Sequence, residues 1–252
     1  MRTAQLIRVL APRELRIRYR QSLLNIAWAI ITPLLMLAVY GVVLTQSFGV
    51  TESCAPYLLV AWTGIVAWTF VSPAIGTAVF SLVHSADLMT KLYFPREALP
   101  LAAVGAALAE LGIGLASLVV FAWFKGIGPS AEMLLAIFPL LLVIIWTAAA
   151  SVFSAVLATF TRDAIHAVNV LLRVGFFATT VVYSADQVPP SLQWSVELNP
   201  VSVAITALRD TLLCGQRFDV HLMVIHLLVA VGLLVCSVFY TRSVEQRIID
   251  VV

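Results

Sequence analysis

Charged side chains are scarce in this sequence. They make up 11% of the 252 residues, and Lys91 and Lys125 are its only lysines. An ordinary soluble domain is about 25% charged and about half apolar, whereas apolar residues reach 62% here. The chain has too few polar side chains to cover its own surface. This composition excludes an ordinary soluble protein and predicts an integral membrane protein.

Motifs that carry enzyme chemistry are missing as well. The sequence has no glycine-rich P-loop, so any ATP must be bound by another protein. The four histidines are scattered, and the nearest two, His221 and His226, do not share a helix face as metal ligands would. We therefore expect no catalytic, cofactor-binding or metal-binding residue in this chain.

Cysteine is also rare. Cys54, Cys214 and Cys236 follow no spacing typical of a metal or redox site, and their odd number leaves at least one thiol unpaired. We interpret them as structural residues. The first 20 residues carry six arginines and no continuous apolar core, so we expect no cleaved signal peptide.

Apolar stretches of about 20 residues are abundant, and this length crosses roughly 30 Å of hydrocarbon as a helix. A helix satisfies its own backbone hydrogen bonds in lipid, so the expected fold is all-α. Six transmembrane helices are predicted: residues 25–46, 57–83, 98–124, 132–160, 166–183 and 221–240. No repeat or soluble insert separates them, so residues 1–252 are expected to form a single transmembrane domain.

Basic residues predict the orientation, because loops rich in lysine and arginine stay in the cytoplasm. Six spans place eleven of the fifteen basic residues on the side of both termini. The opposite side receives Lys125, Arg209 and Arg217, and Arg173 falls inside the fifth span. Both termini are therefore predicted to be cytoplasmic, and the bias fits a bacterial inner membrane.

Two cytoplasmic segments have mixed apolar and charged patterns. In residues 1–22, apolar positions recur at near-helical spacing among arginines, which favours a helix lying in the headgroup region over a solvated basic tail. Residues 84–97 form the longest polar piece between spans. That segment is equally compatible with a helix docking on a partner protein and with an ordinary loop.

Residues 184–219 lie on the outer side and are too apolar for a solvated loop. Pro189, Pro190 and Pro200 stop one helix and can open the next, so we expect two short helices that dip partly into the membrane. Such segments persist at membrane depth only when they are buried in protein or line a water-filled cavity.

Two ionisable residues fall inside predicted spans, Glu110 and Arg173. Charges at such depth usually face the bundle interior, so we hypothesise that they form an ion pair, with a substrate contact as the alternative. Most aromatic residues fit an interfacial belt. Trp62, Trp68 and Phe70 do not fit the belt. Together with Tyr183, we assign them to a path along which sugar rings could stack.

The order of these features resembles the membrane subunits of ABC-2 type exporters, in particular the permeases for O-antigen, teichoic acid and capsular polysaccharides. The resemblance rests on the runs 13–23, 91–100, 161–163 and 198–200, the last followed by Arg209. Each run alone is a weak signal, but their order and spacing together are specific. The match extends over essentially the whole chain.

This resemblance implies a homodimer that binds two copies of a separate ATPase subunit, which would hold ATP and magnesium, and that exports a lipid-linked polysaccharide. Residues 84–97 would be the coupling helix, and 184–219 the gate helices at the outer exit. The residues assigned to ATPase docking are Asp87, Lys91, Tyr93, Phe94, Arg162 and Asp163. Those assigned to the gate are Pro189, Pro190, Asn199, Pro200 and Arg209.

Two other functions stay open from the sequence. One is an ABC-2 exporter for a lipid, a drug or another small molecule, with the same fold and partner. The other is an integral membrane enzyme or assembly factor, which would need an inward cluster of ionisable residues that the sequence does not offer.

Overall fold

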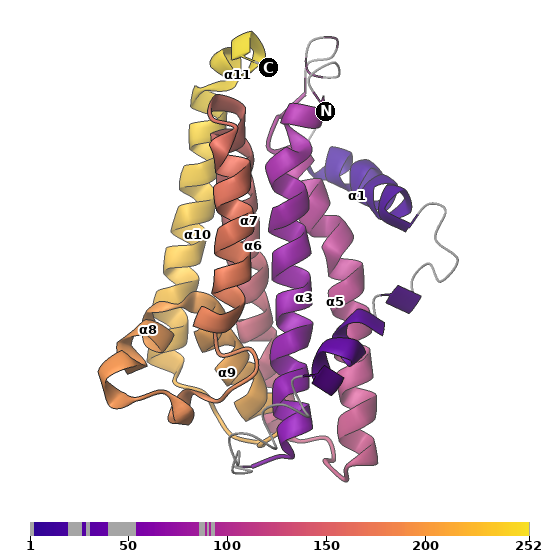
Figure 1. Cartoon of the computed structure of the whole chain (residues 1–252), viewed down its shortest axis with the longest axis vertical. Helices are drawn as coiled ribbons and strands as arrows, with labels where there is room; N and C mark the ends of the chain where they lie inside the picture. Colours follow the sequence, from indigo (N-terminus) through magenta and orange to yellow (C-terminus); the bar gives the residue numbers. More distant parts are fainter. Residues whose placement is uncertain are drawn as a thin grey trace.

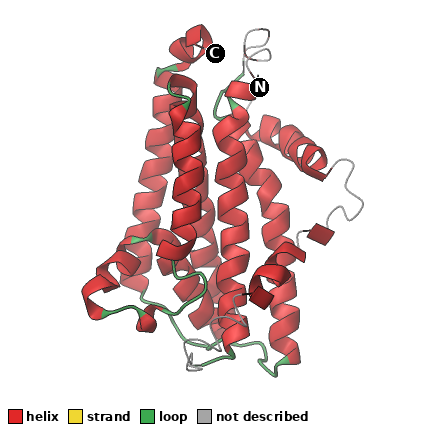
Figure 2. Ribbon diagram, viewed as in Figure 1, coloured by secondary structure: helices red, strands yellow, loops and turns green. Residues whose placement is uncertain are grey.

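A computed structural model describes residues 3–19, 27–28, 31–39, 54–85, 89, 91 and 94–251, and this part of the chain is helical without strands (Figures 1 and 2). The α-helices are α1 (Thr3–Tyr19), α3 (Tyr57–Ser81), α5 (Ala98–Phe124), α6 (Ile137–Phe160), α7 (Asp163–Ala178), α8 (Gln193–Leu198), α9 (Pro200–Leu212), α10 (Val220–Ser243) and α11 (Glu245–Val251). Short 3₁₀ turns are η2 (Val83–Ser85), η3 (Ala131–Ala136), η4 (Ala185–Gln187) and η5 (Pro190–Leu192).

Four helical segments of the described chain are long and apolar enough to cross a membrane: Tyr57–Ser81, Ala98–Phe124, Ala131–Phe160 and Val220–Ser243. The predicted first span, residues 25–46, lies largely outside the described residues, although 31–39 are helical. The chain is therefore a multi-pass membrane protein, and the count of six spans stays a prediction.

The predicted fifth span, residues 166–183, is wrong at its C-terminal end. Helix α7 stops at Ala178, and Thr179 already has an extended backbone with φ −111° and ψ 149°. The residues that follow, through Val182, are β-branched, and β-branched side chains lose rotamer freedom in a helix. Helix α7 is therefore shorter than the apolar run in the sequence.

Helix α3 lies at the centre of the bundle, in contact with α5, α6, α7 and α9. It is apolar on all sides and mostly buried, as expected of a helix without a polar face. Helix α10 packs along α6 at the periphery and exposes most of its apolar side chains. Helix α1 lies across the bundle and packs on α5, where Gly105 faces Ile7 and Ala11 (Figure 1).

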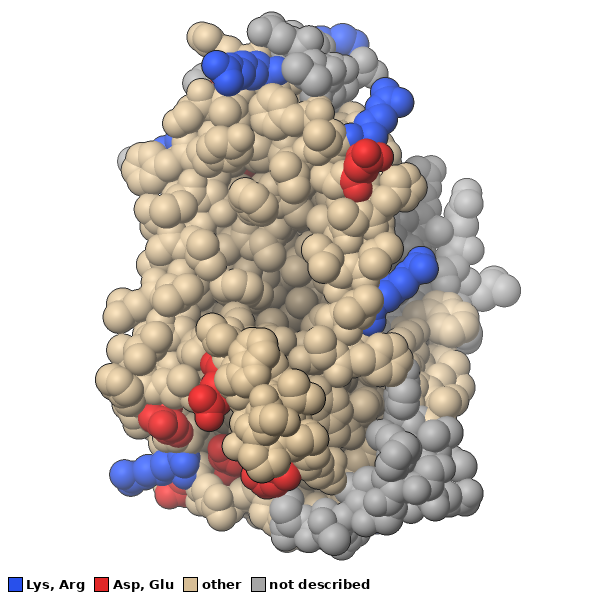
Figure 3. All heavy atoms as spheres, turned by 60° about the vertical axis from the view of Figure 1, so that its left-hand side comes forward, with Lys and Arg blue, Asp and Glu red and all other residues tan. Residues whose placement is uncertain are grey.

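Charge is concentrated at the two ends of the molecule. Helices α1 and α11 lie at one end and α8 and α9 near the other (Figure 1). On the face drawn in Figure 3, basic side chains gather at the first end and acidic ones at the second, while the broad middle is nearly uncharged. This distribution is that of a protein whose middle lies in hydrocarbon.

Helix α3 makes a very close backbone contact at Gly64. A Cβ atom added there would overlap the backbone oxygen, carbon and Cα of Val181. Only glycine leaves room for the segment after α7 to lie directly on α3. The contact fixes how deeply this non-helical segment is buried.

We expect Gly64→Ala to destabilise the fold by about 1–3 kcal/mol, because the new methyl group forces the 179–183 segment away from α3. Gly112→Ala in α5 is the matched control, since a Cβ there meets nothing within 4 Å. Thermal unfolding of the purified protein, followed by size exclusion, measures both. Equal melting temperatures for the two variants would contradict the close contact.

Candidate functional site

The polar chemistry of the chain lies in two places. We call the region made by α8, α9, the start of α3 and residues 179–188 the α9 end. We call the region made by α1, the described residues 83–85, 89, 91 and 94–97, and the α10–α11 junction the terminal end. Between them, the bundle is almost entirely apolar.

Arg209 is the centre of the α9 end. Its side chain is buried and donates three hydrogen bonds to backbone carbonyls: from Nε to Val60 (3.0 Å), from Nη1 to Tyr183 (2.9 Å) and from Nη2 to Val181 (2.8 Å). Two of these carbonyls belong to the segment that follows α7 and has no helical partners. The guanidinium group, with five donors in a fixed plane, satisfies them inside an apolar surrounding.

Neighbouring side chains complete this arrangement. The Tyr57 hydroxyl donates to the Val182 carbonyl at 2.9 Å. Asn199 caps α9 by accepting from the backbone amides of Val201 and Ser202, and its amide group donates to the Thr179 hydroxyl at 3.0 Å. The capping residue therefore also attaches α9 to the residue where α7 ends.

The predicted gate residues divide into two groups. Asn199 and Arg209 hydrogen-bond to the 179–183 segment, and Pro200 is the buried first residue of α9. Pro189 and Pro190 are exposed at the start of η5 and take no part in this cluster. The helices α8 and α9 are joined at Asn199, which is the N-cap of α9.

A disulfide also closes the α9 end. Cys54, before α3, is bonded to Cys214, after α9, with 5.3 Å between their Cα atoms. Cys236 on α10 is a free, exposed thiol. The structural interpretation of the cysteines fits the bonded pair, and the sequence could not identify which two residues pair.

Acidic side chains border this end. A cavity of about 180 Å³ beside α9 is lined in part by Glu197, Asp210 and Asp219. Burial raises the pKa of the Asp210 carboxyl from its ordinary value, and the charge of Arg209 opposes that shift. On the face drawn in Figure 3, acidic side chains gather at this end beside a basic one.

At the terminal end, Arg96 and Glu97, each 2% exposed, form ion pairs with the more exposed side chains of Glu245 and Arg242. Glu97 Oε1 accepts from Arg242 Nη2 at 2.6 Å and Nε at 3.1 Å. Arg96 Nε lies 3.4 Å from Glu245 Oε1. Sequence reasoning used this dipeptide only as part of a family motif. The usable signal was a pair of opposite charges immediately before a long helix whose only charged residue is Glu110.

The residues predicted to dock an ATPase are placed differently from one another. Lys91, Arg162 and Asp163 are exposed at the terminal end. Phe94 is 7% exposed and packs inside the chain with Leu82 and Ile248, so the docking role predicted for it does not fit. The remaining two, Asp87 and Tyr93, lie outside the described residues.

The aromatic residues predicted to line a channel belong to the packing core instead. Trp62, Trp68 and Phe70 are 3%, 8% and 0% exposed. Trp68 meets Phe176 edge to face with 6.1 Å between ring centroids, and Tyr183 donates to the Phe177 carbonyl. Helix α3 buries these side chains because it is surrounded by other helices, a position that hydropathy does not reveal.

Glu110 and Arg173 do not form the predicted ion pair within the described chain. They lie on α5 and α7, which pack on different sides of α3 (Figure 1). Arg173 is exposed on α7, in line with His166, Asn169 and Phe177 at helical spacing. His166, Asn169 and Arg173 form a polar stripe along α7.

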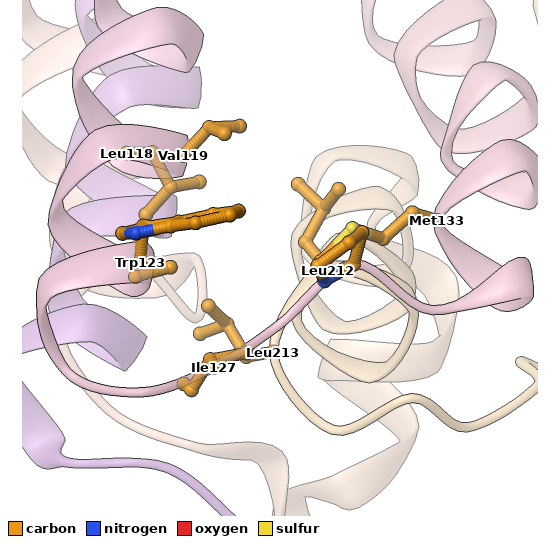
Figure 4. A pocket seen from close by; sticks show the side chains of 9 residues that line it. Leu118, Val119, Trp123, Ile127, Met133, Leu212 and Leu213 are labelled. Atoms are coloured by element: carbon orange, nitrogen blue, oxygen red, sulfur yellow. The ribbon is translucent and has the colours of Figure 1, made fainter.

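Three further cavities of the described chain are lined mainly by apolar side chains. A cavity of about 120 Å³ lies between α5, η3 and the end of α9, and Figure 4 shows Trp123, Met133 and Leu212 among the side chains around it. A groove of about 470 Å³ between α6 and α10 and a pocket of about 530 Å³ containing Trp62 are also lined mainly by carbon. None of these three offers a passage for a hydrophilic polymer.

The model of the family described as ABC-2 type transporter matches residues 5–213. The chain is 25% identical over 246 residues to a Klebsiella pneumoniae protein named O-antigen export system permease protein RfbA. The aligned region covers 95% of this chain and 94% of the relative. A protein of the same name from Myxococcus xanthus is 30% identical over 203 residues, covering 79% of this chain and 76% of the relative.

We expect Arg209→Gln to lower the free energy of unfolding by several kcal/mol, because hydrogen bonds from a charged group contribute about 1.5–3 kcal/mol each. Arg217→Gln is the control, since Arg217 is exposed near the same end. Thermal unfolding in detergent compares the two. If Arg209→Gln unfolds at the same temperature as the control, the three carbonyl contacts do not stabilise this end.

Proposed function

The chain belongs to the ABC-2 type transporter family, and on this basis we propose that it is the transmembrane subunit of an ATP-driven exporter that moves a lipid-linked polysaccharide across the bacterial inner membrane. The relatives named O-antigen export permeases support the polysaccharide class, because the Klebsiella similarity extends over 95% of the chain. The cargo is accordingly an O-antigen-like glycan, a teichoic acid or a capsular polymer.

The transport path lies between two copies of the chain, along the exposed face of α7. Arg173 carries this proposal. A charged side chain that faced hydrocarbon would be costly, and such residues usually face a water-filled path or a protein partner. The three apolar cavities described for one copy do not suit a glycan. A path at the dimer axis lets the stripe of His166, Asn169 and Arg173 meet the hydroxyl groups of the cargo.

A separate ATPase subunit binds at the terminal end, one to each copy, and supplies the ATP and magnesium sites that this chain lacks. The exposed residues Lys91, Arg162 and Asp163 support this placement, because they carry charge of both signs at the end where α1 and α11 lie. Complementary charges on a partner would fix the docking register.

The terminal end faces the cytoplasm, and the α9 end faces the opposite side. Basic residues at the terminal end support this orientation. The Cys54–Cys214 bond supports it independently, because disulfides persist in oxidising compartments and not in a bacterial cytoplasm. Helices α8 and α9 then border the outer exit.

The test is a pull-down of the tagged chain from native membranes in mild detergent. We expect an ATPase with a P-loop to co-purify, and the double variant Lys91→Glu, Arg162→Glu to reduce its recovery roughly tenfold through reversed charge at the docking surface. The control is Lys125→Glu at the opposite end. A chain that purifies alone in every detergent and nanodisc tried would refute the exporter.

We expect Arg173→Gln to lower glycan export by about tenfold while leaving ATPase recovery unchanged, because a charge in the path contacts the cargo and not the partner. Val170→Gln is the control for an added polar group on the same helix face. Surface glycan and intracellular glycan are measured by blotting. Normal surface glycan in Arg173→Gln cells would remove α7 from the path.

A further inference from the structure

Arg96 and Glu97 connect four parts of the terminal end. Glu97 is the N-cap residue of α5 and accepts from Thr3 at the start of α1 (3.5 Å) as well as from Arg242. Arg96 donates from Nη2 to the Met89 carbonyl at 3.1 Å, and its guanidinium carbon lies 4.9 Å from the centre of the Phe94 ring. One dipeptide therefore touches α1, Met89, Phe94 and the C-terminal helices, and it directly precedes α5.

The two ion pairs form a two-point contact. Arg242 lies in the last turn of α10 and Glu245 is the first residue of α11, so the pairs lie on either side of the α10–α11 junction. The order of charge is crossed: the positive Arg96 meets the negative Glu245, and the negative Glu97 meets the positive Arg242. Two neighbouring contacts of opposite sign fix orientation as well as distance.

Packing beneath the charges joins the same elements. Leu82, Met89 and Phe94 form one buried cluster with Leu99 of α5 and Ile248 of α11, and Leu6 and Leu10 of α1 pack against it. This apolar cluster alone would hold the elements together, and burying ions beside it adds a desolvation cost. The charged contacts are therefore best explained by a requirement for a defined geometry.

We propose that Arg96 and Glu97 are positioning residues that pass a displacement of Met89 and Phe94 to α10 and α11 through Glu245 and Arg242. This inference rests on the proposed function, in which an ATPase binds at the terminal end. A displacement of Met89 or Phe94 on ATPase binding shifts Arg96, and the crossed ion pairs carry that shift to the α10–α11 junction. Helix α10 otherwise packs mainly on α6. The ion pairs thereby connect α10 to the end of the molecule where the ATPase binds.

The test uses the full chain in complex with its co-purified ATPase and changes the more exposed partner, because substituting a buried charge risks misfolding. Arg242 is 58% exposed in its side chain. We expect Arg242→Gln to assemble normally and to hydrolyse ATP at a rate within about twofold of the unsubstituted chain, while glycan exported per ATP falls by about tenfold, the size typical of coupling residues. Arg242→Lys keeps the charge and should restore at least half of the export.

Glu245→Gln is the second variant and should show the same loss, whereas Arg247→Gln, an exposed arginine of α11, should not. Unchanged export per ATP in both Arg242→Gln and Glu245→Gln would overturn the inference. So would a loss of export that only follows the amount of assembled complex, since that describes a structural role. Failure of the unsubstituted chain to bind any ATPase would instead refute the proposed function itself.

Discussion

The hydrogen bonds from Arg209 to backbone carbonyls are the interaction on which the α9 end depends. In hydrocarbon every backbone group needs a partner within the protein, and the segment after α7 leaves its helix while still buried. Arg209 and Tyr57 supply donors for Val181, Val182 and Tyr183, and Gly64 supplies the space. The end of α7 at Ala178 and the packing of residues 179–183 on α3 both depend on this arrangement.

The terminal end uses arginine in a different way. Arg209 is bound by neutral carbonyls of a fixed backbone, whereas Arg96 and Arg242 are bound by the carboxylates of Glu245 and Glu97. Carbonyls that belong to packed backbone cannot exchange partners without local unfolding. Ion pairs between side chains of separate helices can shift as those helices move. The contacts of Arg209 are thus held by packed backbone, whereas those of Arg96 and Arg242 join side chains of separate helices.

The sequence predicted the membrane environment, the apolar helices, the short helices after residue 184 and the transport family, because these depend on composition and on motif order. It was less informative where burial depends on neighbours: Trp68 and Phe70 were assigned to a channel and Phe94 to ATPase docking, and all three are buried. The expected pairing of Glu110 with Arg173 failed because depth along the membrane says nothing about which helices are adjacent. The bond between Cys54 and Cys214 likewise needed three-dimensional proximity.

That bond has a consequence for biogenesis. Cys54 precedes α3, and Cys214 follows α9, 160 residues later. Helices α3, α5, α6 and α7 are therefore all synthesised before Cys214 can reach Cys54. Until then the Cys54 thiol has no Cys214 to bond with. Closure of the bond marks the moment at which the core of the bundle has been inserted.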